Sequence, residues 1–565
     1  MSSPAVLNNT TQLRALHLAP EFRLLAIVVA SSAAVIVPAV VFGIPSSRDL
    51  TNHFRFALPF YDAVTHGNFY PSWLAESNGG LGDASFRFYP PALYYLLTAV
   101  RLLTGNWYSA TLITFALLFV AGALGVYGWA RSLFTPRIAM WAAILFTVSP
   151  YHLNQFYQSS LLAEFAACSI LPFGFWFIER IRQRQTSTNI AGLAVVYALL
   201  ILTHLPLTVL GSLALLLYSL VRLPKHDRKR MLMALVSAVV IGLALSSFYW
   251  VTMIAEKGWI RADQIQPEPS VNYRLNFVFS TFSPDNLNVW WMNIIVLLSG
   301  LMFAPSLILL WRSKRRANTG GMRALVALLA LAFLMTTQLS LPLWKLLKPL
   351  QETQFPWRWL GILSVAGAIL TAASLPSWFE LARGKFRPLF LIAISSMVVP
   401  VAFSASHIVR EAVYLSASQF ESVLTSVRGS QSIRQWLPVW AGDRIGQMNA
   451  NVELPPRQIE TLSWTPEKRV FSVSEGPTGE ARVHTFYYPY WVATSGQQQL
   501  EVKPSEDGLL LVNVPPQAST ITLQFIEPSR TRASVIVSAL GLLAVVGFLI
   551  LGRRRSEYPP PHVTS

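Results

Sequence analysis

An aspartate and a histidine that could act together follow the first apolar segment of the chain. Asp49 and His53 are four residues apart, a spacing that places two side chains on one face of a helix. A carboxylate held against an imidazole is suited to removing a proton from a hydroxyl group. We expect Asp49 to act as a general base that His53 orients. A contact that only stabilises the helix is the alternative interpretation of the same pair.

The composition indicates what kind of fold must position these residues. Of the 565 residues, 53% are hydrophobic and 13% are charged, whereas soluble domains are about 25% charged. A water-soluble globule could not bury so large an apolar fraction. The sequence therefore predicts a polytopic α-helical membrane protein. The single cysteine, Cys168, lies in an apolar segment, which excludes a disulfide within the chain.

The formal net charge of +17 raises the question of nucleic-acid binding. The positive residues, however, are divided among short segments between apolar stretches. Cytoplasmic loops of membrane proteins carry such an excess of Lys and Arg. We therefore assign these segments to the cytoplasmic face and expect no nucleic-acid partner. The segments are 131–137, 180–184, 222–230, 312–323, 383–387 and 553–555.

About twelve apolar segments can cross the roughly 30 Å of a bilayer's hydrocarbon core. An even number of spans places both termini in the cytoplasm, which agrees with the arginines after the last span. Residues 188–221 are ambiguous, because they could form two spans or one broken helix that would invert every later orientation. The predicted spans are 24–44, 109–130, 138–152, 162–178, 188–204, 206–221, 231–252, 291–311, 324–340, 359–378, 388–405 and 533–552.

These spans divide the chain into a membrane domain and a domain outside the membrane. Alternating segments such as 509–514 and 520–525 predict short strands, and hence a small β-sandwich before the last span. The predicted parts are a cytoplasmic N-terminus at 1–23, a transmembrane domain at 24–405 with its first outer loop at 45–91, an extracytoplasmic β-rich domain at 406–532, the last span at 533–552 and a cytoplasmic tail at 553–565.

Several short motifs carry a resemblance to a known family. The Asp49–His53 pair is followed by G-x-x-Y-P-x-W at 67–73, F-Y-P-P at 88–91 and, much later, F-P-W-R at 355–358. This order of motifs resembles bacterial membrane proteins labelled 6-pyruvoyl-tetrahydropterin-synthase-related. Those proteins are similar to the GT-C superfamily of glycosyltransferases, which use polyprenyl-phosphate-linked sugars. The resemblance implies a GT-C-like membrane domain.

The resemblance also implies roles for individual residues. A lipid-phosphate leaving group calls for cations at the outer membrane boundary, and Arg87 and Arg358 are expected to bind it because guanidinium can hold phosphate bidentately. Lys345 is expected to supplement them, and Glu164 to be a second catalytic acid that contacts the acceptor or a metal. The alternatives are that Arg87 and Arg358 extend toward lipid headgroups, that Lys345 is a solvent-exposed loop residue, and that Glu164 is an ordinary glutamate at the membrane interface.

The predicted function is transfer of a sugar from a polyprenyl-phosphate donor to an envelope glycan, lipid or protein acceptor. The reaction is placed on the outer face of a bacterial cytoplasmic membrane. A divalent cation, Mg²⁺ or Mn²⁺, is the cofactor it could need, although the sequence defines no metal site. Pterin-synthase chemistry gains no support, because the histidines that would hold its zinc are scattered. A transporter or lipid flippase, or a non-catalytic scaffold in an envelope-polymer assembly, are the alternatives.

Overall fold

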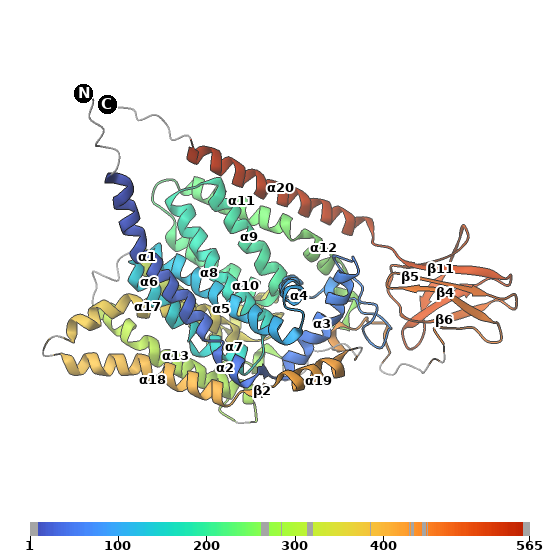
Figure 1. The fold of residues 1–565 in the computed structure, drawn as a ribbon, viewed down its shortest axis with the longest axis horizontal. Coiled ribbons are helices and arrows are strands. Elements are labelled where there is room, and N and C mark those ends of the chain that lie inside the picture. The colour runs from blue at the N-terminus through green and yellow to red at the C-terminus, as the bar shows by residue number, and fades with distance from the viewer. Residues whose placement is uncertain are drawn as a thin grey trace.

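The chain forms a bundle of helices with a β-sheet region at one end (Figure 1). The computed structural model describes residues 9–557 apart from 262–270, 284, 313–319, 383, 385, 429, 431–433, 443–447 and 449. Helix α1 (Asn9–Ala34) begins, and helix α20 (Ser529–Glu557) ends, at the side of the bundle away from the β-sheet region. Both ends of the described chain therefore lie on the same side of the bundle.

Eight of the described helices are long and apolar enough to cross a membrane. A ninth crossing is added if α11 (Arg228–Leu245) and the helix after it, bent by 71°, form one broken span. The expected number of about twelve exceeds this, because three of the expected spans form helices of only 12 to 17 residues. The eight spans are Pro20–Phe42, Trp107–Arg131, Leu162–Gln183, Leu205–Arg222, Asn288–Leu309, Pro356–Leu381, Arg387–Arg410 and Ser529–Gly552.

The remaining helices connect these spans or lie at their ends. The three short apolar helices are α6 (Pro136–Thr147), α9 (Ser187–Thr203) and α14 (Gly320–Thr336). The connecting helices named below are α3 (Arg48–Thr65), α4 (Ala92–Thr104), α7 (Pro150–Tyr157), α12 (Ser247–Glu256), α15 (Leu341–Leu346) and α16 (Lys348–Gln351). Six of the spans are helices α5 (Trp107–Arg131), α8 (Leu162–Gln183), α10 (Leu205–Arg222), α13 (Leu287–Arg312), α17 (Leu360–Leu381) and α18 (Arg387–Arg410).

Helices α9 and α10 form a hairpin that turns at His204. The hydroxyl groups of Tyr197 and Ser212, on either side of the turn, lie 3.0 Å apart. At the other end of the hairpin, Arg222 of α10 pairs at 2.5 Å with Glu179 near the end of α8, which is also where α9 begins. Residues 188–221 are therefore two antiparallel helices. The orientation of the later helices is not inverted.

Positive segments gather at the end of the bundle that holds the start of α1. Arg131, at the end of α5, pairs with Glu21 of α1 at 2.9 Å. Arg222 reaches the first residue of α14, Gly320, and the end of α20 lies against Thr188 of α9. Assignment of this end to the cytoplasm remains a prediction. Of the predicted positive residues, Lys314, Arg315, Arg316, Arg383 and Lys385 lie outside the described residues.

Helix α17 belongs to the most buried of the eight spans, and it contacts α6, α13 and α14. Its first residues are all buried, and glycines allow its neighbours to approach closely. A Cβ atom at Gly367 would lie 2.4 Å from the ring of Phe303, and one at Gly361 would lie 2.8 Å from the sulfur of Cys168. Because packing of this kind leaves little room for movement, the turn immediately before α17 is held firmly.

At the opposite end, two distant parts of the chain join in a short antiparallel sheet. Strand β1 (Ile44–Ser46), directly after the first span, pairs with β2 (Val413–Leu415), directly after α18. Helix α19 (Ala417–Val427) then packs on α3, with the rings of Phe54 and Phe420 5.1 Å apart. Residues 413–427, which the sequence analysis places in the β-rich domain, thus pack on the membrane domain.

The β-sheet region consists of two antiparallel sheets that pack face to face. One has the strand order β3-β6-β10-β9, and the other has the order β4-β5-β11-β7-β8. Their shared core is built from alternating inward residues such as Phe471, Val483, Leu510 and Ile521. The strands are β3 (Val452–Glu453), β4 (Ile459–Thr465), β5 (Lys468–Val473), β6 (Gly479–Phe486), β7 (Trp491–Ser495), β8 (Gln498–Leu500), β9 (Val502–Pro504), β10 (Leu509–Val514) and β11 (Ser519–Phe525).

The first outer loop is part of the core of this β-sheet region. The indole ring of Trp73 stacks on Phe525 at 5.3 Å and meets Trp491 edge-on at 5.7 Å. The backbone N–H of Phe486 donates to the carbonyl of Leu81 at 2.7 Å. The two sheets are consequently fixed to the loop that precedes α4 as well as to α20.

Candidate active site

Asp49 lies in the first turn of α3, immediately after the strand that follows the first span. A carboxylate is favoured there because the N-terminal end of a helix carries partial positive charge. The amide of Asn52 donates to Oδ1 of Asp49 at 3.3 Å. The hydroxyl of Ser47 donates to the carbonyl of Ser159 at 2.8 Å, which fixes the start of α3 against the junction of α7 and α8.

Glu164 and Arg358 form a buried ion pair on the far side of that junction. Glu164, in the first turn of α8, is 2% exposed and accepts from Nε of Arg358 at 2.8 Å. Its other oxygen accepts from the hydroxyl of Tyr151 at 2.5 Å and from the amide of Gln155 at 2.9 Å. Arg358 lies in the 3₁₀ turn Pro356–Trp359 before α17 and also donates from Nη1 to the carbonyl of Thr353.

The Asp49 carboxylate lies within electrostatic reach of this ion pair. Burial raises the pKa of Asp49 above its ordinary value, the bond from Asn52 and the charge of Arg358 lower it, and the charge of Glu164 raises it again. Burial has the largest effect, so the net shift is upward. The structure therefore places Asp49 within electrostatic reach of Glu164 and Arg358, although the three come from distant parts of the chain. Their expected roles in catalysis remain predictions.

Tyr89 joins this cluster, and the sequence analysis does not identify it as a site residue. Burial and the negative charge of Asp49 raise the pKa of its phenol, while the charge of Arg358 lowers it. One residue of the F-Y-P-P motif at 88–91 thus lies within electrostatic reach of the arginine of the F-P-W-R motif at 355–358. These two motifs are the most specific ones in the chain, and this specificity is the sequence feature that could have identified Tyr89 as a site residue.

His53 does not orient Asp49. Its Nδ1 atom lies 3.0 Å from the hydroxyl of Tyr94, and its ring also meets Tyr89 edge-on at 6.4 Å. Burial lowers its pKa to about 3, so the imidazole is neutral at physiological pH. Asn52, one residue closer along α3, occupies the contact with Asp49 that the spacing predicts for His53. Helical spacing therefore predicts which side of α3 contacts Asp49, but not which residue on that side does so.

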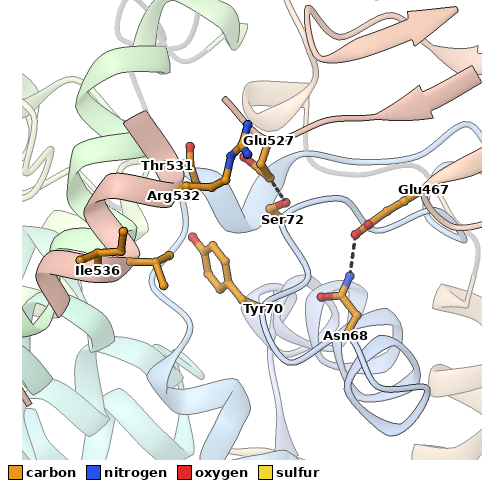
Figure 2. A pocket seen from close by; sticks show the side chains of 9 residues that line it. Asn68, Tyr70, Ser72, Glu467, Glu527, Thr531, Arg532 and Ile536 are labelled. Carbon is orange, nitrogen blue, oxygen red and sulfur yellow. Dashed lines mark hydrogen bonds between the residues drawn. The ribbon is translucent and has the colours of Figure 1, made fainter. Parts of the chain in front are cut away.

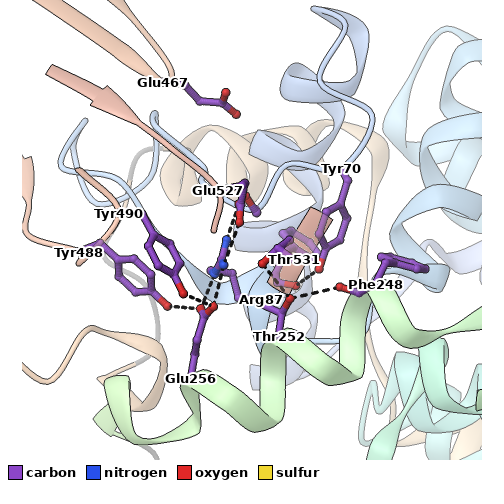
Figure 3. Close-up of polar contacts among 12 residues, drawn as sticks. Tyr70, Arg87, Phe248, Thr252, Glu256, Glu467, Tyr488, Tyr490, Glu527 and Thr531 are labelled. Atoms are coloured by element: carbon purple, nitrogen blue, oxygen red, sulfur yellow. Dashed lines mark hydrogen bonds and ion pairs between the residues drawn. The ribbon is translucent and has the colours of Figure 1, made fainter. Parts of the chain in front are cut away.

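Arg87 lies in a separate network, which Figure 3 shows. Its guanidinium is fully buried and donates to Glu256 of α12 at 2.5 and 2.8 Å. It also donates to Glu527, just after β11, at 2.5 and 3.1 Å, and it lies over the ring of Tyr490. The guanidinium of Arg87 is thus already paired with two carboxylates. The phosphate contact expected of Arg87 therefore does not fit the geometry, which instead joins the loop before α4 to α12 and to the β-sheet region.

Lys345 and His204 have simpler positions. The side chain of Lys345 is exposed in the last turn of α15, and its carbonyl accepts from Gln351 at 3.0 Å. His204 caps α10, because its Nδ1 atom accepts from the N–H of Leu207 at 3.2 Å. Burial lowers the pKa of His204, with smaller effects from Arg358 and His53.

A divalent cation would need several ligating side chains in one place within the described part of the chain. No group of three or more His, Cys, Asp or Glu side chains there is arranged to hold a metal ion. In the cluster, Asp49 has carboxylate oxygens to offer, whereas the oxygens of Glu164 already accept from three side chains. The donor set does not fit a metal held by both carboxylates.

Comparison with solved structures finds similarity to GT-C glycosyltransferases. The oligosaccharyltransferase AglB from Archaeoglobus fulgidus, in complex with an inhibitory peptide and a dolichol-phosphate, matches 71% of this chain and 57% of its own, with 12% identity and a TM-score of 0.48. ArnT from Cupriavidus metallidurans, bound to undecaprenyl phosphate, matches 72% and 74%, with 14% identity and a TM-score of 0.42. The mycobacterial arabinofuranosyltransferase AftD matches 68% and 26%, with 19% identity and a TM-score of 0.43.

The chain thus spans 57% of the length of the oligosaccharyltransferase that it matches. No curated protein matches its sequence. Residues 86–415, more than half of the chain, match the membrane protein family described as the 6-pyruvoyl-tetrahydropterin synthase related domain. That range includes the F-Y-P-P and F-P-W-R motifs and the Glu164–Arg358 pair. The chain belongs to this 6-pyruvoyl-tetrahydropterin synthase related family of membrane proteins.

Proposed function

We propose that the protein is a membrane glycosyltransferase that transfers a sugar from a polyprenyl-phosphate donor to a hydroxyl-bearing acceptor. The observation that carries this proposal is the position of the Asp49 carboxylate beside the Glu164–Arg358 ion pair. The proposed base and the proposed phosphate-binding cation are then within electrostatic reach of each other, at the end of the bundle opposite the positive segments. We place this end at the outer face of a bacterial cytoplasmic membrane, with both termini in the cytoplasm.

Asp49 is the general base of this proposal. A base works best when its pKa lies near the operating pH, and burial moves the pKa of Asp49 in that direction. Asp49 would take the proton of the acceptor hydroxyl as that oxygen attacks the anomeric carbon of the donor. The bond from the anomeric carbon to the phosphate oxygen breaks, and its electron pair leaves with the lipid phosphate. A single displacement of this kind inverts the configuration of the sugar.

Arg358 is the cation that would stabilise the leaving phosphate. Its Nε and Nη1 atoms are used by Glu164 and Thr353, whereas no described residue accepts from Nη2, which is not sealed from solvent. A guanidinium stays charged and can donate to phosphate oxygens. Glu164 then acts as a positioning residue, because it holds the Arg358 side chain by its Nε atom. No step is assigned to a divalent cation, since Glu164 lacks free oxygens for one.

The proposal is tested first by finding the product. Mass spectrometry of glycolipids and envelope polymers after deletion of the gene identifies what is lost, and the matching polyprenyl-phosphate sugar is then used as donor in lipid nanodiscs. Asp49→Asn keeps the shape of the side chain but removes the base, so turnover is expected to fall by about 10²- to 10⁴-fold while donor binding persists. Arg358→Gln is expected to weaken donor binding as well as turnover.

Asp62→Asn is the matched control, because Asp62 lies on the same helix and pairs with Arg428 at the surface at 3.0 Å. Its turnover is expected to equal that of the wild type. Full turnover by Asp49→Asn would remove the proposed base. Movement of an intact lipid across the membrane, with no sugar transferred, would favour the flippase alternative, and an unchanged set of glycolipids and polymers would favour the scaffold.

A further inference from the structure

A pocket of about 400 Å³ lies where the first outer loop, the β-sheet region and α20 meet (Figure 2). The loop contributes Asn68, Tyr70 and Ser72, and the β-sheet region contributes Glu467 and Glu527. The rest of the lining comes from the first two turns of α20. The pocket is distinct from the Asp49 cluster, none of whose residues lines it.

The network beside the pocket balances its own charges; Figure 3 shows Arg87, Glu256 and Glu527 of this network. Arg87 pairs with Glu256 and Glu527, and Arg530 pairs with Glu256 at 2.9 Å. Two arginines thus face two glutamates. Any charge that the pocket offers to a ligand must come from the remaining residues.

Two residues of opposite charge remain. Glu467, in the turn between β4 and β5, accepts from the amide of Asn68 at 2.9 Å through Oε1, which leaves Oε2 without a partner among the described residues. Burial and the nearby Glu527 raise the pKa of Glu467, as expected of a carboxylate that lacks a cation. Arg532, on the first turn of α20, has no side-chain hydrogen bond or ion pair to any described residue. Figure 2 shows both side chains at the edge of the pocket.

The apolar side of the pocket is formed by the start of a helix that is apolar enough to cross a membrane. Val535 and Ile536, on the second turn of α20, are 48% and 62% exposed. They belong to the span Ser529–Gly552, of which only 11% is buried inside the protein, so most of this helix faces lipid. A molecule in the pocket would therefore touch an anionic group, a cationic group and the edge of the hydrocarbon layer at once.

We propose that this pocket binds a phospholipid whose headgroup joins a phosphodiester to a primary ammonium group, as in phosphatidylethanolamine. Arg532 donates to the phosphodiester, and Glu467 accepts from the ammonium group. The acyl chains lie along Val535 and Ile536. An ammonium with N–H groups is favoured because a carboxylate can accept hydrogen bonds from it, whereas a trimethylated ammonium has none to donate. Bound lipid would join the loop, the β-sheet region and α20.

The test uses the full-length protein in nanodiscs that contain equal amounts of phosphatidylethanolamine, phosphatidylcholine and phosphatidylglycerol with identical acyl chains. Lipids that remain bound after transfer into detergent are quantified by native mass spectrometry. The wild type is expected to retain phosphatidylethanolamine about tenfold or more over phosphatidylcholine, because a hydrogen bond to a charged group contributes about 1.5–3 kcal/mol. Equal retention of the three lipids by the wild type would overturn the proposal without any mutant.

Two substitutions assign the contacts. Glu467→Gln is expected to abolish the preference for phosphatidylethanolamine over phosphatidylcholine, and Arg532→Gln to lower retention of all three lipids. The matched controls are Glu421→Gln, at an exposed position of α19, and Arg410→Gln, at the exposed end of α18, and both are expected to keep the wild-type preference. A Glu467→Gln protein that keeps its thermal midpoint and also keeps the preference would show that the ammonium binds elsewhere.

Discussion

Nε of Arg358 lies 2.8 Å from Oε2 of Glu164, although 194 residues separate the two in the sequence. Their side chains are 9% and 1% exposed, so the pair is almost fully removed from water. It joins the start of α8 to the turn before the tightly packed helix α17. The ion pair therefore positions Arg358 beside Asp49 and also makes each partner depend on the other for its stability.

Removal of one partner of this pair is expected to cost more than removal of both charges. Arg358→Gln leaves Glu164 buried without its cation, and breaking a buried pair in this way typically costs about 3–5 kcal/mol. In the double variant Arg358→Gln with Glu164→Gln, no charge remains to be desolvated, so stability is expected to recover in large part. Unfolding in mixed micelles, followed by tryptophan fluorescence, measures both. A double variant less stable than the single one would contradict this account.

Three residues of this candidate site can be identified from the sequence without a structure. An acid after the first span, an acid at the start of a later span and an arginine in F-P-W-R all fall at helix ends on one predicted side. Glu164 and Arg358 do pair there, and Asp49 lies within their electrostatic reach. The sequence does not show which acidic residue each arginine pairs with. Arg87, like Arg358, is an arginine beside a specific motif. It nevertheless pairs with Glu256 and Glu527, because α12 and the end of β11 pack against it.

The number of spans shows a similar limit. Hydropathy identifies each of the twelve apolar segments as helical, but α6, α9 and α14 are too short to be counted as spans on length. Helix length depends on where neighbouring helices and capping residues stop the chain, as His204 does between α9 and α10. The position of Trp73 in the β-sheet core was also beyond reach, because it depends on a contact with strands that begin almost 380 residues later in the chain.

The Arg87 network is expected to hold the β-sheet region in place. Arg87→Ala would leave Glu256 and Glu527 without the guanidinium that they share, at a cost of about 3–5 kcal/mol. Arg87→Lys is expected to rescue little, since an ammonium cannot donate to two carboxylates in the planar fork of a guanidinium. Limited proteolysis near residues 526–530, together with thermal unfolding, reports the release of the β-sheet region.

Arg428→Ala is the control for that experiment. Arg428 pairs with Asp62, and its side chain is 61% exposed, so its loss is expected to cost at most about 1 kcal/mol. If Arg87→Ala were no more destabilising than Arg428→Ala, the buried network would not be what holds the sheets against the loop.

Labelling of single cysteines tests the predicted orientation of the bundle. The native Cys168 is buried, so it is not expected to react in intact cells. A cysteine introduced by Glu506→Cys, in the turn before β10, is expected to react with an impermeant maleimide from outside. One introduced by Lys229→Cys, at the start of α11 and in a positive segment, is expected to react only after permeabilisation. The reverse pattern would place the candidate active site at the cytoplasmic face.

The raised pKa of Asp49 predicts a pH-dependent cost in stability that needs no substrate to measure. A carboxyl group whose pKa is higher in the folded protein binds its proton more tightly there, so folding loses stability as pH rises from the unfolded value of about 3.9 through the folded value. Asn cannot ionise and escapes this loss. Thermal midpoints of Asp49→Asn and the wild type are therefore expected to differ least at acid pH. Relative to the wild type, Asp49→Asn should become more stable toward neutral pH, although it lacks the proposed catalytic base. A wild type that instead gained stability over Asp49→Asn as pH rose would show that the folded protein favours the charged carboxylate.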